Sequence, residues 1–433
     1  MFKCMQMVSG RLRWLVVVPL AVFLVCWQSL SAWAEEPARL DLEQLLTAVE
    51  KTAEAQAAQE KWGAAKHRVP QAEALEDPML GLGVVNVPTT LNFRAEDMTM
   101  KELSLSQRVP FFGKRGLRGE VAGKEAESVQ AAATETVNRL RSRVKLVYHD
   151  LSHAYRAIEV TERNKAILES YAKIADVRYQ VGQGIQFDLV KAQASVTRMI
   201  DDLIMLKQQK SALEAKLNGL LNQPTETPLG RPVDAVPQKL NQSLSQLQQA
   251  ALESSPILAG MKAMTQSKEK GHALAKAEYL PDFNFRGAYG QRERNLDGER
   301  RKDMVSGMIE ISLPVYFLSK QGPRETEAKA DLRMATAQYE SMKNEVYYMV
   351  AEVVSMLDRQ WKQIELYKTG LIPQANLQVS SAMSSYTVNK ADFMALLDSR
   401  MELYRAELSL HQALTEYQKS LASLELLVGK RLN

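Results

Sequence analysis

Hydrophobic positions follow a helical period over two very long runs of this chain. Between Gly123 and Val181 there is no proline, and Leu, Val, Ile, Ala and Tyr recur at three- and four-residue spacing. These 59 residues predict a helix of roughly 90 Å at about 1.5 Å per residue. Such a length exceeds a globular core and indicates coiled-coil packing. An equivalent run over 324–387 contains Gly370 and Pro373, which we expect to kink it.

Four short segments instead alternate apolar and polar positions, which is the period of a β-strand. Their approximate bounds are 79–87, 99–109, 282–290 and 304–313. In the third segment Phe283 and Phe285 fall on one face, while Asn284 falls on the other. The pattern is typical of transmembrane strands, and it also fits a soluble sheet with one buried face. Because the chain offers no other core for these faces to cover, we favour the membrane interpretation.

Membrane strands would have a direct consequence for assembly. An open sheet cannot lie in lipid, because its edge groups would lack hydrogen-bond partners. Four strands are too few to close alone, since small barrels need about eight. Two chains would supply eight strands with a filled interior, and three would supply twelve, which is wide enough for a pore. The strand pattern therefore predicts an oligomer.

Landmarks at a nearly constant offset indicate that the chain is a tandem duplication. Pro78 and Pro281 are 203 residues apart, and Tyr179 and Tyr386 are 207 apart. Each copy begins with a helical stretch (about 40–75 and about 243–278), followed by two alternating segments, a long helical run, a break and a last helix. The predicted domains are a first repeat at 35–225, a proline-containing linker at 226–240 and a second repeat at 241–433. The fold class is therefore mainly α with a small β part.

A proline stands at each predicted junction between helix and strand: Pro78, Pro110, Pro281 and Pro314. Proline fixes φ, cannot donate to a strand ladder, and disfavours helix in the residue before it. It is therefore suited to ending one hydrogen-bonding pattern before the next begins. We expect these four prolines to lie in one narrow layer of the molecule.

The first 34 residues have the pattern of a secretory signal peptide. A basic start precedes an apolar segment and a small-x-small cleavage pattern: Lys3, Arg11 and Arg13, then Leu15 to Cys26, then Ala32-Trp33-Ala34. An uncleaved anchor is the alternative, and a lipoprotein signal is disfavoured because Val25 stands where a small residue is needed. Cys4 and Cys26 both lie in this segment, so the mature chain would have no disulfide.

Charge and motifs exclude several function classes. Removing the three basic residues of the signal changes the balance from 55 basic against 51 acidic to 52 against 51, which gives no reason to expect nucleic-acid binding. No phosphate loop, nucleophile elbow or zinc-protease motif occurs, so we predict no enzyme activity and no cofactor. His149 and His153 have the i, i+4 spacing of a metal pair, but without a third ligand a packed or solvated helix face is the better interpretation.

Several stretches resemble the outer-membrane efflux proteins of the TolC family, over essentially the whole mature chain. The plan of the duplication carries the resemblance, and "DPMLGLGVVNVP", "SQRVPFFGKR" and "YKTGLIPQA" look most like its heavy-metal (CzcC/CusC-like) branch. The resemblance implies a homotrimer in the outer membrane of a Gram-negative bacterium. Its strands would form a shared twelve-stranded barrel, and its helices a tunnel (an α-barrel) across the periplasm.

The resemblance also implies partners and a role. The trimer would be the exit duct of a tripartite efflux system, joined by a periplasmic adaptor to a proton-driven inner-membrane pump of the RND type. The cargo would be heavy-metal cations, with drug efflux and type I polypeptide secretion as alternatives of the same fold. A soluble periplasmic coiled-coil scaffold or adaptor is the alternative of another class, although an adaptor typically has one helical hairpin and this chain has two.

The family's functional positions carry over to two groups of residues. The turns that would contact the adaptor are Val181, Gly182 and Gln183 in the first copy and Val388, Asn389 and Lys390 in the second. The positions that would close the pore are Asp188, Tyr386 and Asp398, and for Asp398 a solvated position on a helix is the alternative. Ala391 and Ala395 replace charged gate residues of some relatives, and Lys390 would substitute for one of them. An alternative role for Asp188 is to cap the helix that follows the first turn.

Overall fold

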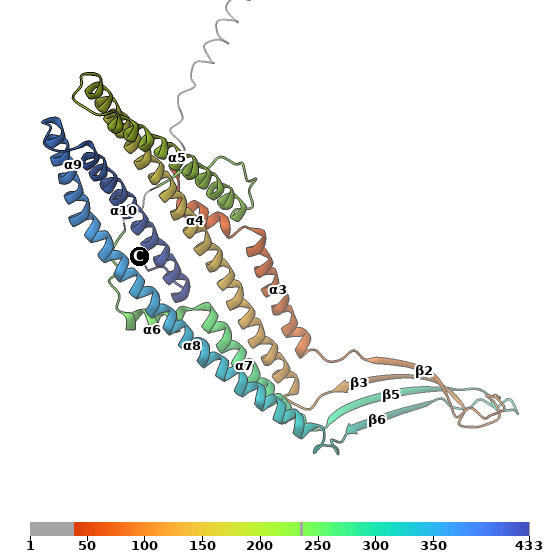
Figure 1. The fold of residues 1–433 in the computed structure, drawn as a ribbon. Helices are drawn as coiled ribbons and strands as arrows, with labels where there is room; N and C mark the ends of the chain where they lie inside the picture. Colours follow the sequence, from red (N-terminus) through yellow and green to blue (C-terminus); the bar gives the residue numbers. More distant parts are fainter. Residues whose placement is uncertain (1–38, 234–236, 433) are drawn as a thin grey trace, which may run out of the picture.

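The computed structural model describes residues 39–233 and 237–432. The predicted signal segment, with Cys4 and Cys26, lies outside these residues. Long helices run side by side, with a small sheet projecting from one end and two helical hairpins ending together at the other (Figure 1). The described chain is therefore mainly helical with a small β part, as the sequence predicts.

The two copies have the same order of elements, with α4 of the first copy corresponding to α8 and α9 together in the second. The first copy consists of α2 (Leu42–Val49), α3 (Ala53–Glu73), β2 (Met79–Val85), β3 (Met100–Val109), α4 (Lys114–Gln180) and α5 (Gln186–Leu220). The second consists of α6 (Leu244–Ser254), α7 (Pro256–Ala277), β5 (Asp282–Arg292), β6 (Met304–Ser312), α8 (Gln321–Leu366), α9 (Ile372–Thr387) and α10 (Phe393–Val428). The stretches expected as single helices at 40–75 and 243–278 are each two helices. The second stretch breaks at Ser255, because Pro256 favours the first position of a new helix.

The longest helix begins earlier than the sequence predicts. α4 has 67 residues, which corresponds to roughly 100 Å. It starts at Lys114 rather than near 123, directly after Gly113, whose φ of +89° is a conformation that glycine adopts without strain. Neither Gly116 nor Gly119 ends the helix, because the packing of α3 and α7 along α4 outweighs their low helix propensity.

The equivalent run of the second copy is interrupted as expected near Gly370 and Pro373. The chain forms a π-helical turn over Tyr367–Leu371 between α8 and α9, and the Ile372 N–H donates to the Tyr367 carbonyl. Pro373 has no N–H to donate to the carbonyl four residues earlier. The wider turn accommodates this loss, so the interruption has an identifiable cause in the sequence.

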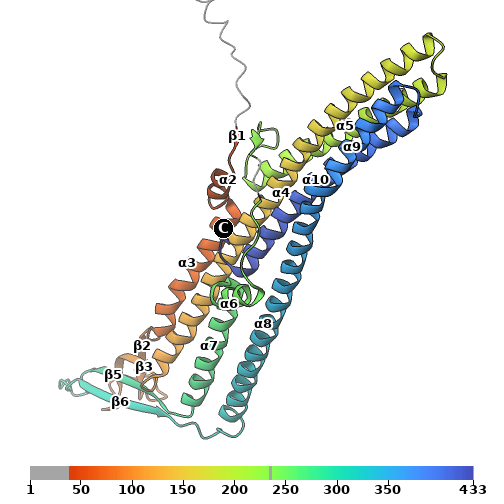
Figure 2. The ribbon, with the colours of Figure 1, turned by 90° about the vertical axis from the view of Figure 1, so that its left-hand side faces the viewer.

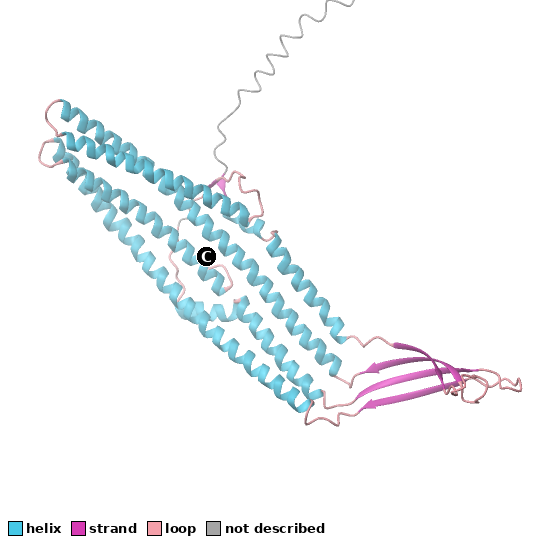
Figure 3. Cartoon of the chain, turned by 45° about the vertical axis from the view of Figure 1, so that its right-hand side comes forward, coloured by secondary structure: helices cyan, strands magenta, loops and turns pink. Residues whose placement is uncertain are grey.

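The sheet joins the two copies. Its order is β2-β3-β5-β6 with all neighbours antiparallel, and the central pair β3 and β5 runs in register from Met100↔Arg292 to Val109↔Phe283. Figure 3 shows this sheet in magenta beyond one end of the helices. β2 and β6 are the outer strands, so each has one backbone edge without a partner in the described chain. Every residue of β6 is exposed. The sheet is therefore open at both edges.

Among the residues that the structure describes, the buried apolar side chains of the helices form three separate clusters. One joins α2, α4 and α5 around Leu140 and Leu151, and one joins α6, α8 and α10 around Leu357 and Leu424. The third lies near the hairpin tips and combines residues of α4, α5, α9 and α10. Figure 2 shows the two hairpins lying against one another along this region. The hairpins are therefore packed as one unit at their tips.

Residues 221–243 connect the copies and include the linker expected at 226–240. Within them β4 (Arg231–Pro232) pairs in parallel with β1 (Arg39–Leu40). The hydroxyl of Tyr417 donates to the Gln238 carbonyl (2.7 Å) and accepts from the Leu240 N–H (2.9 Å). The Tyr148 hydroxyl accepts from the Val233 N–H at 2.8 Å. Two buried tyrosines thus hold part of a segment that the sequence predicts only as an extended linker.

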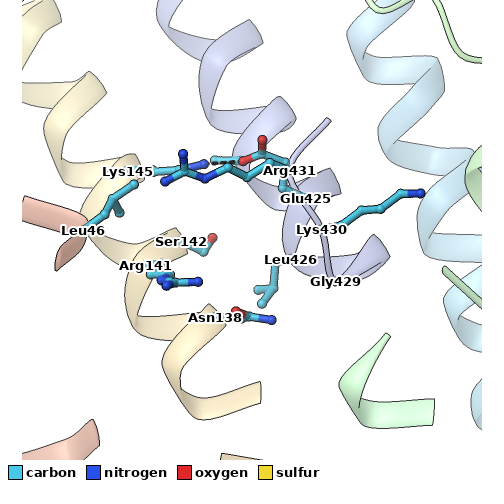
Figure 4. A pocket seen from close by; sticks show the side chains of 11 residues that line it. Leu46, Asn138, Arg141, Ser142, Lys145, Glu425, Leu426, Gly429, Lys430 and Arg431 are labelled. Atoms are coloured by element: carbon cyan, nitrogen blue, oxygen red, sulfur yellow. Dashed lines mark hydrogen bonds and ion pairs between the residues drawn. The ribbon is translucent and has the colours of Figure 1, made fainter. Parts of the chain in front are cut away.

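Ion pairs connect the beginning of the first copy to the end of the second. Lys145 of α4 pairs with Glu425 of α10, and Arg431 pairs with Glu43 of α2 at 2.8 Å. Lys145, Glu425 and Arg431 line a small cavity of about 80 Å³ (Figure 4). Since Lys145 and Arg431 each have a carboxylate partner, the cavity is a structural junction between the copies.

Candidate functional site: the tips of the two helical hairpins

The first tip is a glycine-dependent helix ending. α4 ends at Gln180, and Gly182 has a φ of +72°. The Gly182 N–H donates to the Tyr179 carbonyl (3.0 Å), and the Gln183 N–H donates to the Arg178 carbonyl (2.8 Å). This pair of bonds is a Schellman motif, which satisfies carbonyls that the helix leaves unpaired.

The second tip repeats this geometry with asparagine in place of glycine. Asn389 has a φ of +59°, its N–H donates to the Tyr386 carbonyl (3.2 Å), and the Lys390 N–H donates to the Ser385 carbonyl (2.9 Å). Asparagine tolerates this left-handed conformation better than most residues with a Cβ. The departure from glycine therefore leaves the turn itself unchanged.

The helices after the tips begin differently, and Asp188 is not the helix cap that the sequence offers as an alternative. Ile185 occupies the N-cap position of α5, so Asp188 lies in the first helical turn instead of capping it. In the second copy Asp392 is the N-cap and accepts from the Ala395 N–H at 2.8 Å. A carboxylate near the amino end of a helix is favourable at either position. Each copy therefore has one carboxylate near this helix start. The two positions differ by three residues when the repeats are aligned.

Arg178 joins the two tips, a role that sequence reasoning missed. Its guanidinium donates to the Thr387 carbonyl (3.2 Å) and to Asn389 Oδ1 (2.8 Å), and it lies 4.3 Å from the centre of the Tyr386 ring. Cation–π contact of this kind is favourable when the ring is partly dehydrated. The aligned residue of the second copy is Ser385. The difference between arginine and serine at this position of the two repeats is the signal by which Arg178 could have been found.

The three expected gate residues lie on three different helices of the hairpins, Asp188 on α5, Tyr386 on α9 and Asp398 on α10. Tyr386 is buried against Phe393 with 5.6 Å between ring centres. Asp188 is half-buried and makes no hydrogen bond to Tyr386 within the described residues. Loss of water and repulsion by Asp392 raise the pKa of Asp188, partly offset by Arg178. Asp398 is exposed on α10.

The two tips differ in their apolar surface. Exposed large apolar side chains crowd the first tip: Val177, Tyr179, Val181, Ile185, Phe187 and Val190. At the aligned positions of the second copy only Val388 is an exposed large apolar residue, because Ser384 and Asp392 are polar and Tyr386 and Leu397 are buried. The first tip therefore offers most of the apolar contact area.

The junction prolines lie at the strand ends. Pro78 and Pro281 directly precede β2 and β5, Pro110 directly follows β3, and Pro314 is two residues beyond β6. Beside them is a contact that the sequence did not indicate. The buried Lys114 ammonium donates to Asp282 and to the Leu280 carbonyl, both at 2.7 Å. This ion pair fixes the first turn of α4 against the start of β5.

The histidine pair of α4 does not lie on a solvated face. His149 is buried, and loss of water with repulsion from Lys145 lowers its pKa to about 4. His153 and His411 line the same cavity. Over residues 39–233 and 237–432 no three His, Cys, Asp or Glu side chains are arranged to hold a metal ion. Nor does any helix in these ranges contain a stretch long and apolar enough to cross a membrane.

Comparisons with known proteins agree with this architecture. The outer membrane efflux protein family matches residues 47–223 and 247–430. The outer membrane efflux protein BepC of Brucella suis is 21% identical over 287 residues, which are 65% of this chain and 60% of BepC. The aligned part thus spans less than two thirds of that relative.

Solved structures share the fold at low sequence identity. The outer membrane protein VceC of Vibrio cholerae superposes with a TM-score of 0.75 at 15% identity, covering 90% of this chain and 97% of VceC. CusC gives a TM-score of 0.75 at 14% identity, covering 92% and 94%. Since the family model matches both repeats over most of their length, the chain belongs to the outer membrane efflux protein family.

Proposed function

We propose that this chain is the outer-membrane exit duct of a tripartite efflux system, working as a homotrimer in a Gram-negative bacterium. The observation that carries the proposal is the combination of an open sheet at one end with two paired hairpin tips at the other. The sheet would span the outer membrane, and the helices would cross the periplasm. A duct of this kind passes cargo without covalent chemistry.

The sheet supports the assembly. Exposed apolar side chains gather on one face, including Leu103, Leu105, Ile309 and Ile311, whereas Asn284, Arg286 and Glu310 lie on the other and hydrogen-bond across the strands. A barrel with lipid outside and water inside requires this arrangement. Three copies would pair the free edge of β6 with the free edge of a neighbour's β2, which removes every edge from lipid.

The hairpin tips are the observation that supports the proposed partners. An adaptor that ends in helical hairpins would meet Val181, Gly182 and Gln183 of the first copy and Val388, Asn389 and Lys390 of the second. The exposed apolar side chains of the first tip would supply contact area, and the adaptor would connect this end to an RND-type inner-membrane pump.

We propose heavy-metal cations as the cargo on the basis of Asp398. The likeness to CusC does not decide the cargo, because the TM-score to VceC is the same. Three exposed Asp398 carboxylates around a threefold axis, with Asp188 and Tyr386 nearby, would make a negative constriction that favours cations.

Ion selectivity in a planar bilayer tests this constriction. Asp398→Ala is expected to reduce the preference for cations over anions, because it removes three negative charges from the narrowest part of the pore. Glu226→Ala, which changes an exposed carboxylate of the linker, is the matched control and should leave selectivity unchanged. Equal selectivity of wild type and Asp398→Ala would remove Asp398 from the gate.

A further inference from the structure

An open apolar groove lies in the helical wall, far along the sequence from the tip residues and the sheet. It has a volume of about 400 Å³ and is bounded by α4, α7 and α8. Pockets that hold small organic ligands commonly have volumes of about 300–1,000 Å³. The groove is therefore large enough for one such ligand.

Small residues create the space. Gly260 of α7 approaches α4 so closely that an added Cβ would lie 3.3 Å from the Ala131 Cβ. Ala132 and Ala335 form walls of the groove on α4 and α8. Gly260 has no side chain, and the side chains of Ala132 and Ala335 end at Cβ. The three helices can therefore pack closely at Gly260 and leave a hollow beside this contact.

The floor of the groove is apolar and adaptable. Ile257, Met261 and Met264 all line it, and their i, i+4, i+7 spacing places them on one face of α7. Ile257 and Met264 remain 38% and 36% exposed, although large apolar side chains of a helix wall are normally covered. Methionine is flexible and polarizable and suits surfaces that accept ligands of varied shape.

One carboxylate stands at this apolar surface without a partner. In the part of the chain that the structure describes, Glu135 makes no hydrogen bond or ion pair. Arg139 of α4 also lines the groove and attracts Glu135, but its guanidinium donates to Glu54 of α3 at 3.3 Å. Burial raises the pKa of Glu135, and the attraction of Arg139 does not compensate for the lost water. A ligand with a positive charge would supply the missing interaction.

We propose that the groove bounded by α4, α7 and α8 binds a lipophilic monocation, with its apolar body on Ile257, Met261 and Met264 and its charge beside Glu135. The site does not depend on the proposed function, because binding to the groove requires neither a pore nor an adaptor. Binding at this groove would place a ligand in the helical wall, separate from any cargo in the lumen.

Tetraphenylphosphonium and tetraphenylborate test this site, because the two ions have the same shape and opposite charge. Calorimetric titration of the purified mature chain in amphipol is expected to show one phosphonium bound per chain and at least about tenfold weaker binding of the borate, which corresponds to ~1.4 kcal/mol. Glu135→Gln should weaken phosphonium binding about tenfold and abolish the discrimination between the two ions.

Two further variants separate the groove from general adsorption. Ala132→Phe should fill the groove from an exposed helical position and abolish binding without unfolding the helix. Glu125→Gln, an unpaired and exposed carboxylate of the same helix outside the groove, should bind phosphonium as the wild type does. Absence of binding by the wild type, as would follow if a neighbouring copy fills the groove, overturns the proposal. Equal affinity of wild type and Glu135→Gln also overturns it.

Discussion

Gly182 and Asn389 hold the same left-handed backbone conformation at equivalent positions of the two copies. Both turns use the same two hydrogen bonds to end a helix, so both positions require a residue that tolerates a positive φ, and Asn389 in addition accepts a hydrogen bond from Arg178. No atom lies within 4 Å of a Cβ added to Gly182. A side chain at position 182 would therefore meet no steric clash. The positive φ still makes most residues with a Cβ unfavourable there, and asparagine is the residue that tolerates it best.

Two substitutions at Gly182 distinguish these effects. Gly182→Ala should destabilise the first tip by about 1–2 kcal/mol, because a Cβ is unfavourable at positive φ. Gly182→Asn should destabilise the tip clearly less, since Asn389 already adopts this positive φ in the second tip. Amide hydrogen exchange of residues 181–185 measures the local opening, and faster exchange is expected in Gly182→Ala than in Gly182→Asn. Equal exchange rates in the two variants would contradict the conformational explanation.

Arg178 shows what residue-level sequence reasoning missed. The turns themselves were predictable, because glycine and asparagine after a long helix are local signals. The contact of Arg178 with Tyr386 and Asn389 joins positions more than 200 residues apart, and no local pattern encodes it. The same applies to Lys114 and Asp282. The alternative that Asp188 caps the helix is wrong because Ile185, three residues earlier, has the extended backbone of the N-cap.

The sequence predicts the helices and strands more completely than it predicts the contacts between them. Prolines mark the strand ends, and Pro373 with Gly370 marks the π-helical turn. The early start of α4 was missed because Gly116, Gly119 and Gly123 lower local helix propensity, and only packing against α3 and α7 restores the helix. The linker was also misjudged in part, because its proline content hides the short β4 strand and its anchoring by tyrosines.

The anchoring of the linker by Tyr417 gives an element-scale prediction. Tyr417→Phe removes the hydroxyl that bonds Gln238 and Leu240, leaving two partly buried backbone groups without a partner. The free energy of unfolding should fall by roughly 1–3 kcal/mol. Thermal unfolding of the detergent-purified protein would report this as a lower midpoint. Tyr348→Phe changes a 65% exposed tyrosine and should leave the midpoint unchanged; an equal decrease in both variants would argue against the linker contact.

At the scale of the whole molecule, both ends of the chain are incomplete alone. The sheet has two free edges and an exposed apolar face, and the first tip has a group of exposed apolar side chains. Large exposed apolar surfaces mark sites of association in stable proteins. Lipid and further copies would cover the sheet, and neighbouring copies with an adaptor would cover the hairpins. The duplicated plan gives each copy a share in both ends.

Cryo-electron microscopy of the mature chain purified in detergent tests the central claim most directly. We predict threefold-symmetric hollow particles longer than ~100 Å, with a closed barrel of twelve strands at one end and six hairpin tips at the other. The free edge of β6 should pair with β2 of the next copy. A monomer that stays soluble without detergent, with β2 and β6 still unpaired, would contradict the account.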